Sequence, residues 1–248
     1  MPKVSVNILT KNRAPLLKQA LLSVSEQSFK DYEVVVVNDG STDNTDEVLQ
    51  DFKISRSKDF KIIKHEISQG IIKSRQEALL ASSGEYVAVL DDDDRWIDAD
   101  KLKKQVEFLD KHPETVLCGG GIEITKLQDY KIEKFRPKTD KQIRNSMLFR
   151  NNFFTSTVMF RRAAALHAGG FINDGDDFAE DYDLWLRLGK LGKMYNFQEP
   201  FTAYRVPEYN KARFKAFLAK QSRLIAREKG NYPAFWLGGA ILRLRQIL

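Results

Sequence analysis

The strongest structural signal in the chain is the stretch Gly84-Glu-Tyr-Val-Ala-Val-Leu-Asp-Asp-Asp-Asp-Arg-Trp96. Its first half, residues 85–90, is a short apolar run that is typical of a buried β-strand. The run leads directly into four consecutive aspartates, Asp91 to Asp94. Because neighbouring carboxylates repel one another, the folded chain must place a cation or strong hydrogen bonds beside them. An acidic strand end therefore predicts a ligand site.

Two earlier stretches repeat this pattern of an apolar strand followed by polar residues. Residues 4–9 end in Thr10-Lys11-Asn12-Arg13, and residues 32–37 end in Asn38-Asp39-Gly40-Ser41. A further strand is predicted at residues 60–65, and apolar residues at helical spacing predict helices over about 15–24, 42–52, 70–81 and 102–109. This alternation predicts an α/β protein with a Rossmann-like, mostly parallel central sheet flanked by helices, whose ligand site lies beyond the carboxyl ends of the strands.

The second half of the chain has a mixed pattern. We expect strands over 116–125 and 156–161, helices over 162–168 and 181–191, and a short extended piece between Pro200 and Val206. Helical periodicity returns over 211–229 and 235–248. The sequence therefore predicts one domain over residues 1–206 and a basic, amphipathic, helical C-terminal extension over residues 207–248.

Composition favours a soluble enzyme. The chain has 248 residues, of which 42% are hydrophobic and 30% are charged, and these values exclude collagen-like and wholly disordered proteins. The single cysteine, Cys118, allows no intrachain disulfide and favours a reducing compartment. The sequence shows no signal-peptide pattern and no apolar run of the roughly 20 residues that span a bilayer. We therefore expect a cytoplasmic protein.

The net charge of +6 is concentrated in the last 50 residues. Residues 199–248 contain ten Lys or Arg and three Asp or Glu, so residues 1–198 carry a net charge of −1. Such a basic segment suggests nucleic acid or anionic lipid as a partner. Its interleaved basic and apolar side chains could rest on lipid headgroups or a lipid diphosphate, or could form a packed amphipathic helix with a solvated basic face.

The polar strand ends offer the residue types that bind a nucleotide and a metal. Asp91 and Asp93 are two residues apart and could bind a hard divalent cation that also contacts a nucleotide diphosphate; the alternative is a solvated acidic turn. Asp39 could accept a hydrogen bond from a base N–H and select a pyrimidine nucleotide, or could simply cap its own turn. Arg75 could pair with a diphosphate or lie on the surface.

A second acidic group precedes the helix predicted over residues 181–191. Acidic residues in the first turn of a helix are stabilised by the helix dipole, so most of them need no catalytic role. One carboxylate held there could nevertheless accept a proton from a substrate hydroxyl. The group consists of Asp174, Asp176, Asp177, Glu180, Asp181 and Asp183.

Four fragments in a fixed order resemble the inverting family 2 glycosyltransferases, which have the GT-A fold and use nucleotide sugars. They are Val4-Ser-Val-Asn-Ile-Leu-Thr-Lys-Asn-Arg13, Glu33-Val-Val-Val-Val-Asn-Asp-Gly-Ser-Thr-Asp43, the stretch Gly84–Trp96, and Gly169-Gly-Phe171 leading to Glu180-Asp-Tyr-Asp-Leu-Trp-Leu-Arg187. Each fragment is common by itself, whereas the four in this order are specific. The resemblance covers about residues 2–206.

The resemblance implies a role for each matching residue. Asp91 and Asp93 would form a D-x-D element that binds Mn²⁺ or Mg²⁺, and Asp181 would be the catalytic base. Glu180 and Trp185 would lie on the acceptor side. A single displacement would invert the anomeric centre, so an α-linked UDP-sugar would give a β-glycoside. The residues implied to bind the nucleotide sugar are Thr10, Asn12, Arg13, Asp39, Arg75, Asp91 and Asp92.

Several positions depart from the family pattern. Lys11 replaces a usual Tyr that can stack on the base, and Gln76 replaces the usual Asn after Arg75. Ser68-Gln69-Gly70 stands where relatives have Asn-x-Gly, and Pro207 stands where many relatives carry a metal-binding His, so the third metal ligand is unassigned. No Gln-x-x-Arg-Trp signature of processive synthases follows Asp181, which favours transfer of a single sugar.

Together these features predict an enzyme that moves one hexose or N-acetylhexosamine from a UDP-sugar to a lipid-linked glycan of a bacterial O-antigen, capsule or lipooligosaccharide. The basic tail would allow peripheral contact with the inner face of the cytoplasmic membrane, and the sequence also allows a homodimer. One alternative is a sugar-phosphate nucleotidyltransferase, but its Gly-rich loop after the first strand is missing. The other is a nucleic-acid-binding module using the tail; since the body is near neutral and has no recognition motif, we expect no nucleic-acid partner.

Overall fold

The computed structural model describes residues 1–55, 60–125, 131–172, 179–206, 211–228 and 230–232. Two of the sequence predictions, the acidic residues at 174–177 and the helical pattern over 235–248, lie outside these ranges. Among the helices described, none has the combination of length and apolar character that a bilayer-spanning segment requires.

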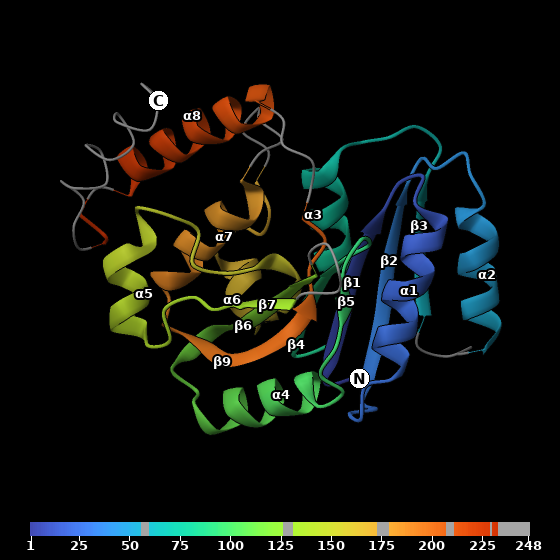
Figure 1. Ribbon diagram of the computed structural model, residues 1–248, viewed down its shortest axis with the longest axis horizontal. Coiled ribbons are helices and arrows are strands. Elements are labelled where there is room, and N and C mark those ends of the chain that lie inside the picture. The colour runs from blue at the N-terminus through green and yellow to red at the C-terminus, as the bar shows by residue number, and fades with distance from the viewer. Residues whose placement is uncertain (56–59, 126–130, 173–178, 207–210, 229, 233–248) are drawn as a thin grey trace.

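A nine-stranded sheet forms the centre of the molecule, with helices on both faces (Figure 1). Its main path runs in the order β3-β2-β1-β4-β8-β6-β9-β5, and β7 pairs with β6 outside this path. The first four strands of this path are parallel, and β8 then runs antiparallel to both β4 and β6. The strands are β1 (Val4–Thr10), β2 (Tyr32–Asp39), β3 (Phe60–His65), β4 (Tyr86–Asp91), β5 (Arg95–Trp96), β6 (Thr115–Thr125), β7 (Lys131–Lys134), β8 (Met159–Arg161) and β9 (Lys193–Ala203).

The helices lie where the chain crosses from strand to strand. This arrangement confirms the predicted α/β class with a Rossmann-like sheet flanked by helices. The helices are α1 (Ala14–Ser25), α2 (Thr45–Ser55), α3 (Ile71–Ala81), α4 (Lys101–Lys111), α5 (Asp140–Met147), α6 (Arg162–His167), α7 (Glu180–Gly189) and α8 (Lys211–Arg227), and a 3₁₀ turn covers Thr155–Thr157.

Strand β4 is apolar from Tyr86 to Leu90 because both of its faces are covered. Val87 and Val89 point into the core that contains α7, whereas Tyr86, Ala88 and Leu90 point into the core that contains α1 and α4. A strand that is buried on both faces has no polar alternation. The chain becomes polar only at Asp91, where the strand leaves the core.

The prediction was wrong for parts of the second half. Strand β9 is eleven residues long instead of a short piece after Pro200, and β5, β7 and α5 were not predicted. Residues 155–157 form the 3₁₀ turn, so β8 is only three residues long and begins at Met159. Strand β9 escapes detection because polar residues interrupt it without regular alternation and it contains Pro200, and its pairing with β6 shifts register at several points.

Helix α8 packs on α7, as Figure 1 shows. Its residues Leu218, Leu224 and Ile225 are buried in the same core as Trp185 of α7. An ion pair of 2.5 Å between Arg227 and Asp183 ties the two helices together. Helix α8 is therefore a packed amphipathic helix, which was one of the two alternatives for the basic C-terminal segment, and its outer positions are exposed.

Lys101, the first residue of α4, is fully buried. Its Nζ donates a hydrogen bond to Gln105 Oε1 at 2.7 Å and lies 4.1 Å from the centroid of the Trp96 ring. Within the described ranges, no carboxylate lies at ion-pair distance from this amine. Burial lowers the pKa of Lys101 to about 7, since a charge there has lost its contact with water.

We expect Lys101→Met to flatten the dependence of stability on pH. Between pH 7 and the ordinary lysine pKa of 10.5, the unfolded chain binds a proton that the native Lys101 does not, so stability rises with pH in this window. The group should contribute about 2 kcal/mol to the rise between pH 7 and 9. Urea unfolding at both pH values measures the effect. The exposed neighbour Lys103→Met is the control and should keep the wild-type rise; an unchanged rise in Lys101→Met would contradict the prediction.

Candidate active site

The three polar strand ends lie at one edge of the sheet, as predicted. Leu9 of β1 is in register with Asp91 of β4, and the next residue, Thr10, is in register with Asn38 of β2. Because the strands are parallel, the residues that follow them emerge on the same side. Residues 91–94 form the tight connection from β4 to β5 at this edge.

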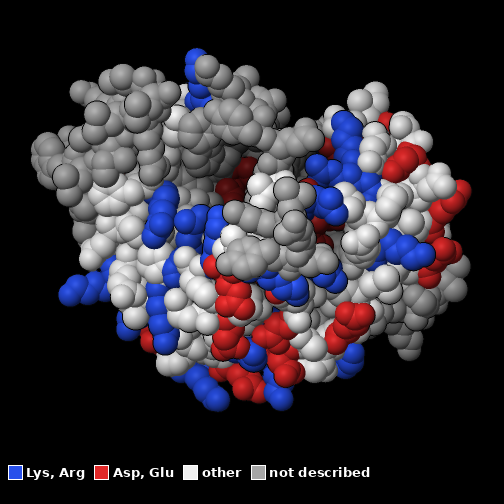
Figure 2. Space-filling view, viewed as in Figure 1, with Lys and Arg blue, Asp and Glu red and all other residues white. Residues whose placement is uncertain are grey.

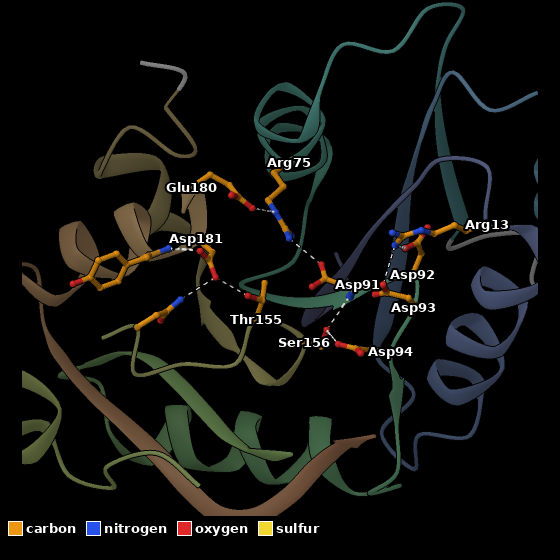
Figure 3. Close-up of polar contacts among 12 residues, drawn as sticks. Arg13, Arg75, Asp91, Asp92, Asp93, Asp94, Thr155, Ser156, Glu180 and Asp181 are labelled. Carbon is orange, nitrogen blue, oxygen red and sulfur yellow. Dashed lines mark hydrogen bonds and ion pairs between the residues drawn. The ribbon is translucent and has the colours of Figure 1, made fainter. Parts of the chain in front are cut away.

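Each of the four aspartates has a polar partner, and Asp92 and Asp93 share one (Figure 3). Arg75 Nη2 donates to Asp91 Oδ1 at 2.9 Å. Arg13 Nη1 donates to Asp92 Oδ1 at 2.9 Å and to Asp93 Oδ2 at 3.0 Å. Asp94 accepts hydrogen bonds from Ser156 Oγ at 2.5 Å and from the backbone N–H of Arg205 at 2.9 Å. Two arginines and a hydroxyl therefore offset the repulsion expected from the sequence.

The environment nevertheless favours protonation of three of these carboxyls. Burial raises the pKa values of Asp92 and Asp93, although the Arg13 charge opposes this effect at both residues. At Asp94, burial and the neighbouring charge of Asp91 raise the pKa to about 7. Added positive charge at this edge would relieve the repulsion.

Arg75 joins the end of β4 to the start of α7. It is 5% exposed, and its Nε donates to Glu180 Oε1 at 2.9 Å while its Nη2 binds Asp91. Burial disfavours the charged guanidinium, but Asp91, Glu180 and Asp181 outweigh this effect and raise the pKa of Arg75. Burial in turn raises the pKa of Glu180, and the Arg75 charge opposes this shift. The arginine is thus enclosed by carboxylates.

Asp181 lies in the first turn of α7 and is partly exposed. Its Oδ2 accepts hydrogen bonds from Thr155 Oγ1 at 2.6 Å and from Asn151 Nδ2 at 3.0 Å (Figure 3). The helix starts after Ala179, whose φ of +55° turns the chain sharply before the acidic residues. Asp181 is therefore held in one orientation, close enough to Arg75 to raise the pKa of that arginine.

Tyr204 lies among the same carboxylates and was not identified from the sequence. Burial and the charges of Asp94, Asp91, Asp93 and Asp181 raise its pKa to about 12. It follows β9 and borders an open pocket of about 370 Å³. The pocket is lined by Leu16, Gln19, Asp93, Asp94, Arg95, Glu123, Thr125, Ala203, Tyr204, Arg205 and Val206.

Asp39 organises the loop between β3 and α3. Its two oxygens accept hydrogen bonds from His65 Nδ1 and the Gln69 N–H at 2.7 Å each, from Ser68 Oγ at 2.6 Å and from the Gly70 N–H at 3.1 Å. Burial opposes ionisation, but these hydrogen bonds lower the pKa of Asp39 to about 2. Asp39 therefore caps the β3–α3 loop instead of its own turn, and contact with a nucleotide base remains a prediction.

His65 lies between two carboxylates. Its Nδ1 contacts Asp39 at 2.7 Å, and its Nε2 contacts Glu77 Oε2 at 2.6 Å. Since both partners are acceptors, both ring nitrogens must carry protons, and the carboxylates raise the pKa of His65 although burial opposes this shift. This contact links Asp39 to helix α3.

The remaining predicted residues occupy different places. Asn12 joins the loops after β1 and β2, since its Oδ1 accepts from the Thr42 N–H at 2.7 Å. Thr10 is buried beside Asp92. The placement of Trp185 on the acceptor side is wrong: this residue is fully buried and packs against Phe160. Glu180 is also buried, where it binds Arg75 rather than facing an acceptor.

The D-x-D carboxylates fit part of a divalent-cation site. The side chains of Asp91 and Asp93 are 33% and 25% exposed, and each has one oxygen outside its ion pair with arginine. Mg²⁺-like cations keep several waters and bind substrate phosphates, so one or two carboxylates can suffice. In the part of the chain that is described, no group of three His, Cys, Asp or Glu residues could hold a metal, and the third ligand stays unassigned.

Comparison with known proteins identifies the family. The model of "Glycosyl transferase family 2" matches residues 5–168, about two thirds of the chain. The chain belongs to glycosyl transferase family 2. This membership confirms the resemblance drawn from the four fragments.

Two relatives of this family 2 protein have informative names. A putative teichuronic acid biosynthesis glycosyltransferase, TuaG of Bacillus subtilis, is 28% identical over 92% of this chain and 88% of its own length. A GalNAc(5)-diNAcBac-PP-undecaprenol β-1,3-glucosyltransferase of Campylobacter jejuni is 38% identical over 38% of this chain and 30% of its own length. The chain spans 66% or less of the length of several other relatives.

Solved structures confirm the GT-A-type fold. S. aureus TarS 1-349 in complex with UDP matches 90% of this chain and 65% of its own, with a TM-score of 0.71 and 21% identity. A mannosyltransferase from Pyrobaculum calidifontis in complex with GDP-Man and Mn²⁺ matches 98% of this chain and 68% of its own, with a TM-score of 0.70 and 21% identity. At this level of identity the likeness shows the fold alone.

Proposed function

We propose that this family 2 protein transfers a single hexose or N-acetylhexosamine from a UDP-sugar to a lipid-linked glycan during assembly of a bacterial surface polysaccharide. One observation carries the proposal. Arg75 binds Asp91 at the end of β4 and Glu180 at the start of α7, so it brings the D-x-D carboxylates and Asp181 to one edge of the sheet. Sugar transfer needs the groups that bind the donor and the group that activates the acceptor to lie close together.

The donor would bind at the ends of β1, β2 and β4. Asp91 and Asp93 would hold Mn²⁺ or Mg²⁺, which offsets negative charge on a nucleotide diphosphate when it is bound. Thr10, Asn12, Arg13, Asp39 and Asp92 would surround the nucleotide. The mannosyltransferase complex with Mn²⁺ and the TarS complex with UDP support this assignment of cofactor and donor.

Asp181 would act as the base. Its carboxylate would accept the proton of an acceptor hydroxyl while that oxygen attacks the anomeric carbon from the face opposite UDP. The bond between the anomeric carbon and the UDP oxygen breaks, and its electron pair leaves with UDP, so the product has the inverted configuration. Asn151 and Thr155 would keep the carboxylate pointed at the hydroxyl, since both bind its Oδ2.

The names of the two relatives support the acceptor class. One relative is placed in teichuronic acid biosynthesis and the other acts on a glycan carried by a polyprenyl diphosphate. The absence of a processive signature after Asp181 favours one transfer per encounter. We place the reaction in the cytoplasm, with peripheral membrane contact through the exposed basic side chains of the C-terminal segment.

A donor screen tests the proposal. Protein stripped with EDTA is incubated with UDP-glucose, UDP-galactose and their N-acetyl forms, with and without Mn²⁺ or Mg²⁺, and released UDP is measured. We expect turnover of at least one donor that depends on the added metal. Turnover of none of them under any metal condition would refute the assignment. A nucleotidyltransferase would instead consume a sugar 1-phosphate and UTP and release pyrophosphate, so a parallel incubation with these substrates, in which pyrophosphate is measured, detects that activity.

A further inference from the structure

Two arginines that adjoin the segment 151–155, which binds Asp181, have no acidic partner among the described residues. Arg136, after β7, and Arg150, after α5, form no ion pair with a carboxylate within the described ranges. Arg136 also donates no hydrogen bond there, and its Nε is buried without a partner. In contrast, Arg13 and Arg75 at the same edge of the sheet are both paired with aspartates. Removal of a guanidinium from water without an anion is costly, so the partly buried Arg136 points to a ligand. Arg150 is exposed, and its Nε donates to Asn152 Oδ1 at 3.2 Å.

The fold holds the two arginines near each other. Asn196 of β9 is fully buried, and its Nδ2 donates to Pro137 O at 2.9 Å and to Asn152 O at 3.0 Å. One side chain thus joins the residue after Arg136 to the segment that follows Arg150. The Arg150 charge is close enough to lower the pKa of Arg136, and burial acts in the same direction. The two positive charges are therefore close enough to repel each other.

Phe154 places Arg136 next to the segment that binds the proposed base. Arg136 lies over the ring of Phe154, with its Cζ 4.4 Å from the ring centroid, and the Phe154 ring is 6.5 Å from that of Tyr204. The residues on either side of Phe154 and Arg150, namely Thr155 and Asn151, bind Asp181. Figure 2 shows basic side chains around a recess on this face of the molecule, with acidic side chains inside it.

We propose that Arg136 and Arg150 form an anion subsite that binds a phosphate group of the acceptor, close to the hydroxyl that Asp181 activates. Two guanidinium groups offer several N–H donors in planar arrays that match phosphate oxygens. The proposal rests on the proposed function, because it assigns this surface to the acceptor. The phosphate could belong to the diphosphate of a lipid carrier or to a phosphodiester within the glycan, and the test separates the two sources.

Binding is measured by calorimetry on the full chain, with and without saturating UDP and Mn²⁺. The probes are geranyl diphosphate and a glycerol phosphate oligomer, with geraniol and glycerol as their uncharged counterparts. We expect at least one phosphate probe to bind well above its uncharged counterpart. Arg136→Gln combined with Arg150→Gln should weaken that binding tenfold or more, since charged hydrogen bonds to both residues are lost, and should leave UDP affinity within twofold.

The matched control removes two positive charges elsewhere. Lys103 and Lys141 are exposed, and Lys103→Gln combined with Lys141→Gln should bind the phosphate probe like the wild type. Binding of geranyl diphosphate alone would assign the lipid carrier, and binding of the glycerol phosphate oligomer alone would assign a glycan phosphodiester. The proposal is overturned if neither phosphate probe binds, if the control weakens binding as much, or if UDP affinity falls with the arginines. Failure of UDP to bind would instead refute the proposed function, while the titration without UDP still tests the subsite.

Discussion

Replacement of Asp181 by Asn is expected to lower the rate of sugar transfer by about 10²–10⁴-fold, the range for loss of a general base. The amide has almost the same shape as the carboxylate but cannot accept the proton of an acceptor hydroxyl. Thr155 can still donate to the amide oxygen, so the start of α7 should remain in place. UDP affinity should stay within about twofold of the wild type, because the proposed role of Asp181 is toward the acceptor hydroxyl and not toward the donor.

Single-turnover transfer and calorimetric titration with UDP separate the two effects. Asp51→Asn, an exposed carboxyl-to-amide change on α2, is the control and should transfer at the wild-type rate. Transfer by Asp181→Asn at a rate near that of the wild type would remove Asp181 from the role of base. Loss of UDP binding together with transfer would mean that Asp181 serves the donor site instead.

The sheet could be predicted where local pattern and burial agree. Strands β1, β2 and β4 are rich in β-branched and other apolar residues because both faces of the parallel half are covered, and each strand ends at a polar turn. Strand β9 gives no such signal, since its conformation is set by pairing with β6 and not by its own residues. A two-residue strand such as β5 is likewise fixed only by its partner.

The site residues could be named from the sequence, but their partners could not. Asp91, Asp93 and Asp181 belong to recognisable fragments, whereas the ion pair between Arg13 and Asp93 joins segments 80 residues apart. The sequence around Asp39 is that of a turn, and one prediction was that Asp39 caps this turn. Its hydrogen-bond donors instead come largely from the β3–α3 loop, which the parallel pairing of β2 and β3 brings near. Such contacts depend on side-chain packing across the sheet edge.

Trp185 is a residue whose role the resemblance implied wrongly. It belongs to the fragment that starts at Glu180, and the resemblance placed both residues on the acceptor side. The first turn of α7 emerges at the sheet edge, whereas Trp185, one turn further, is fully buried in the core that α7 shares with α8. A sequence fragment identifies the residues of a helix but not the depth at which each turn lies.

Arg75→Met is expected to lower the free energy of unfolding by about 3–5 kcal/mol at pH 7, the usual loss when one partner of a buried ion pair is removed. Glu180 would remain buried without its cation, and Asp91 would lose its partner. Because burial already raises the pKa of Glu180, removal of the arginine raises it further above the unfolded value. A carboxyl with a raised native pKa destabilises the fold as pH rises, so the deficit of Arg75→Met should shrink as pH falls.

Urea unfolding at pH 5 and pH 7 measures this deficit, and the double variant Arg75→Met with Glu180→Gln is the matched control. Removing both charges should restore much of the stability, since no carboxylate is then left buried without a cation at α7. A deficit below about 1 kcal/mol in the single variant, or no recovery in the double variant, would contradict the buried pair. The double variant also tests the second role implied for Arg75, which is to bind the donor diphosphate. If the guanidinium of Arg75 binds the diphosphate in the wild type, the double variant should regain stability while its UDP affinity stays low.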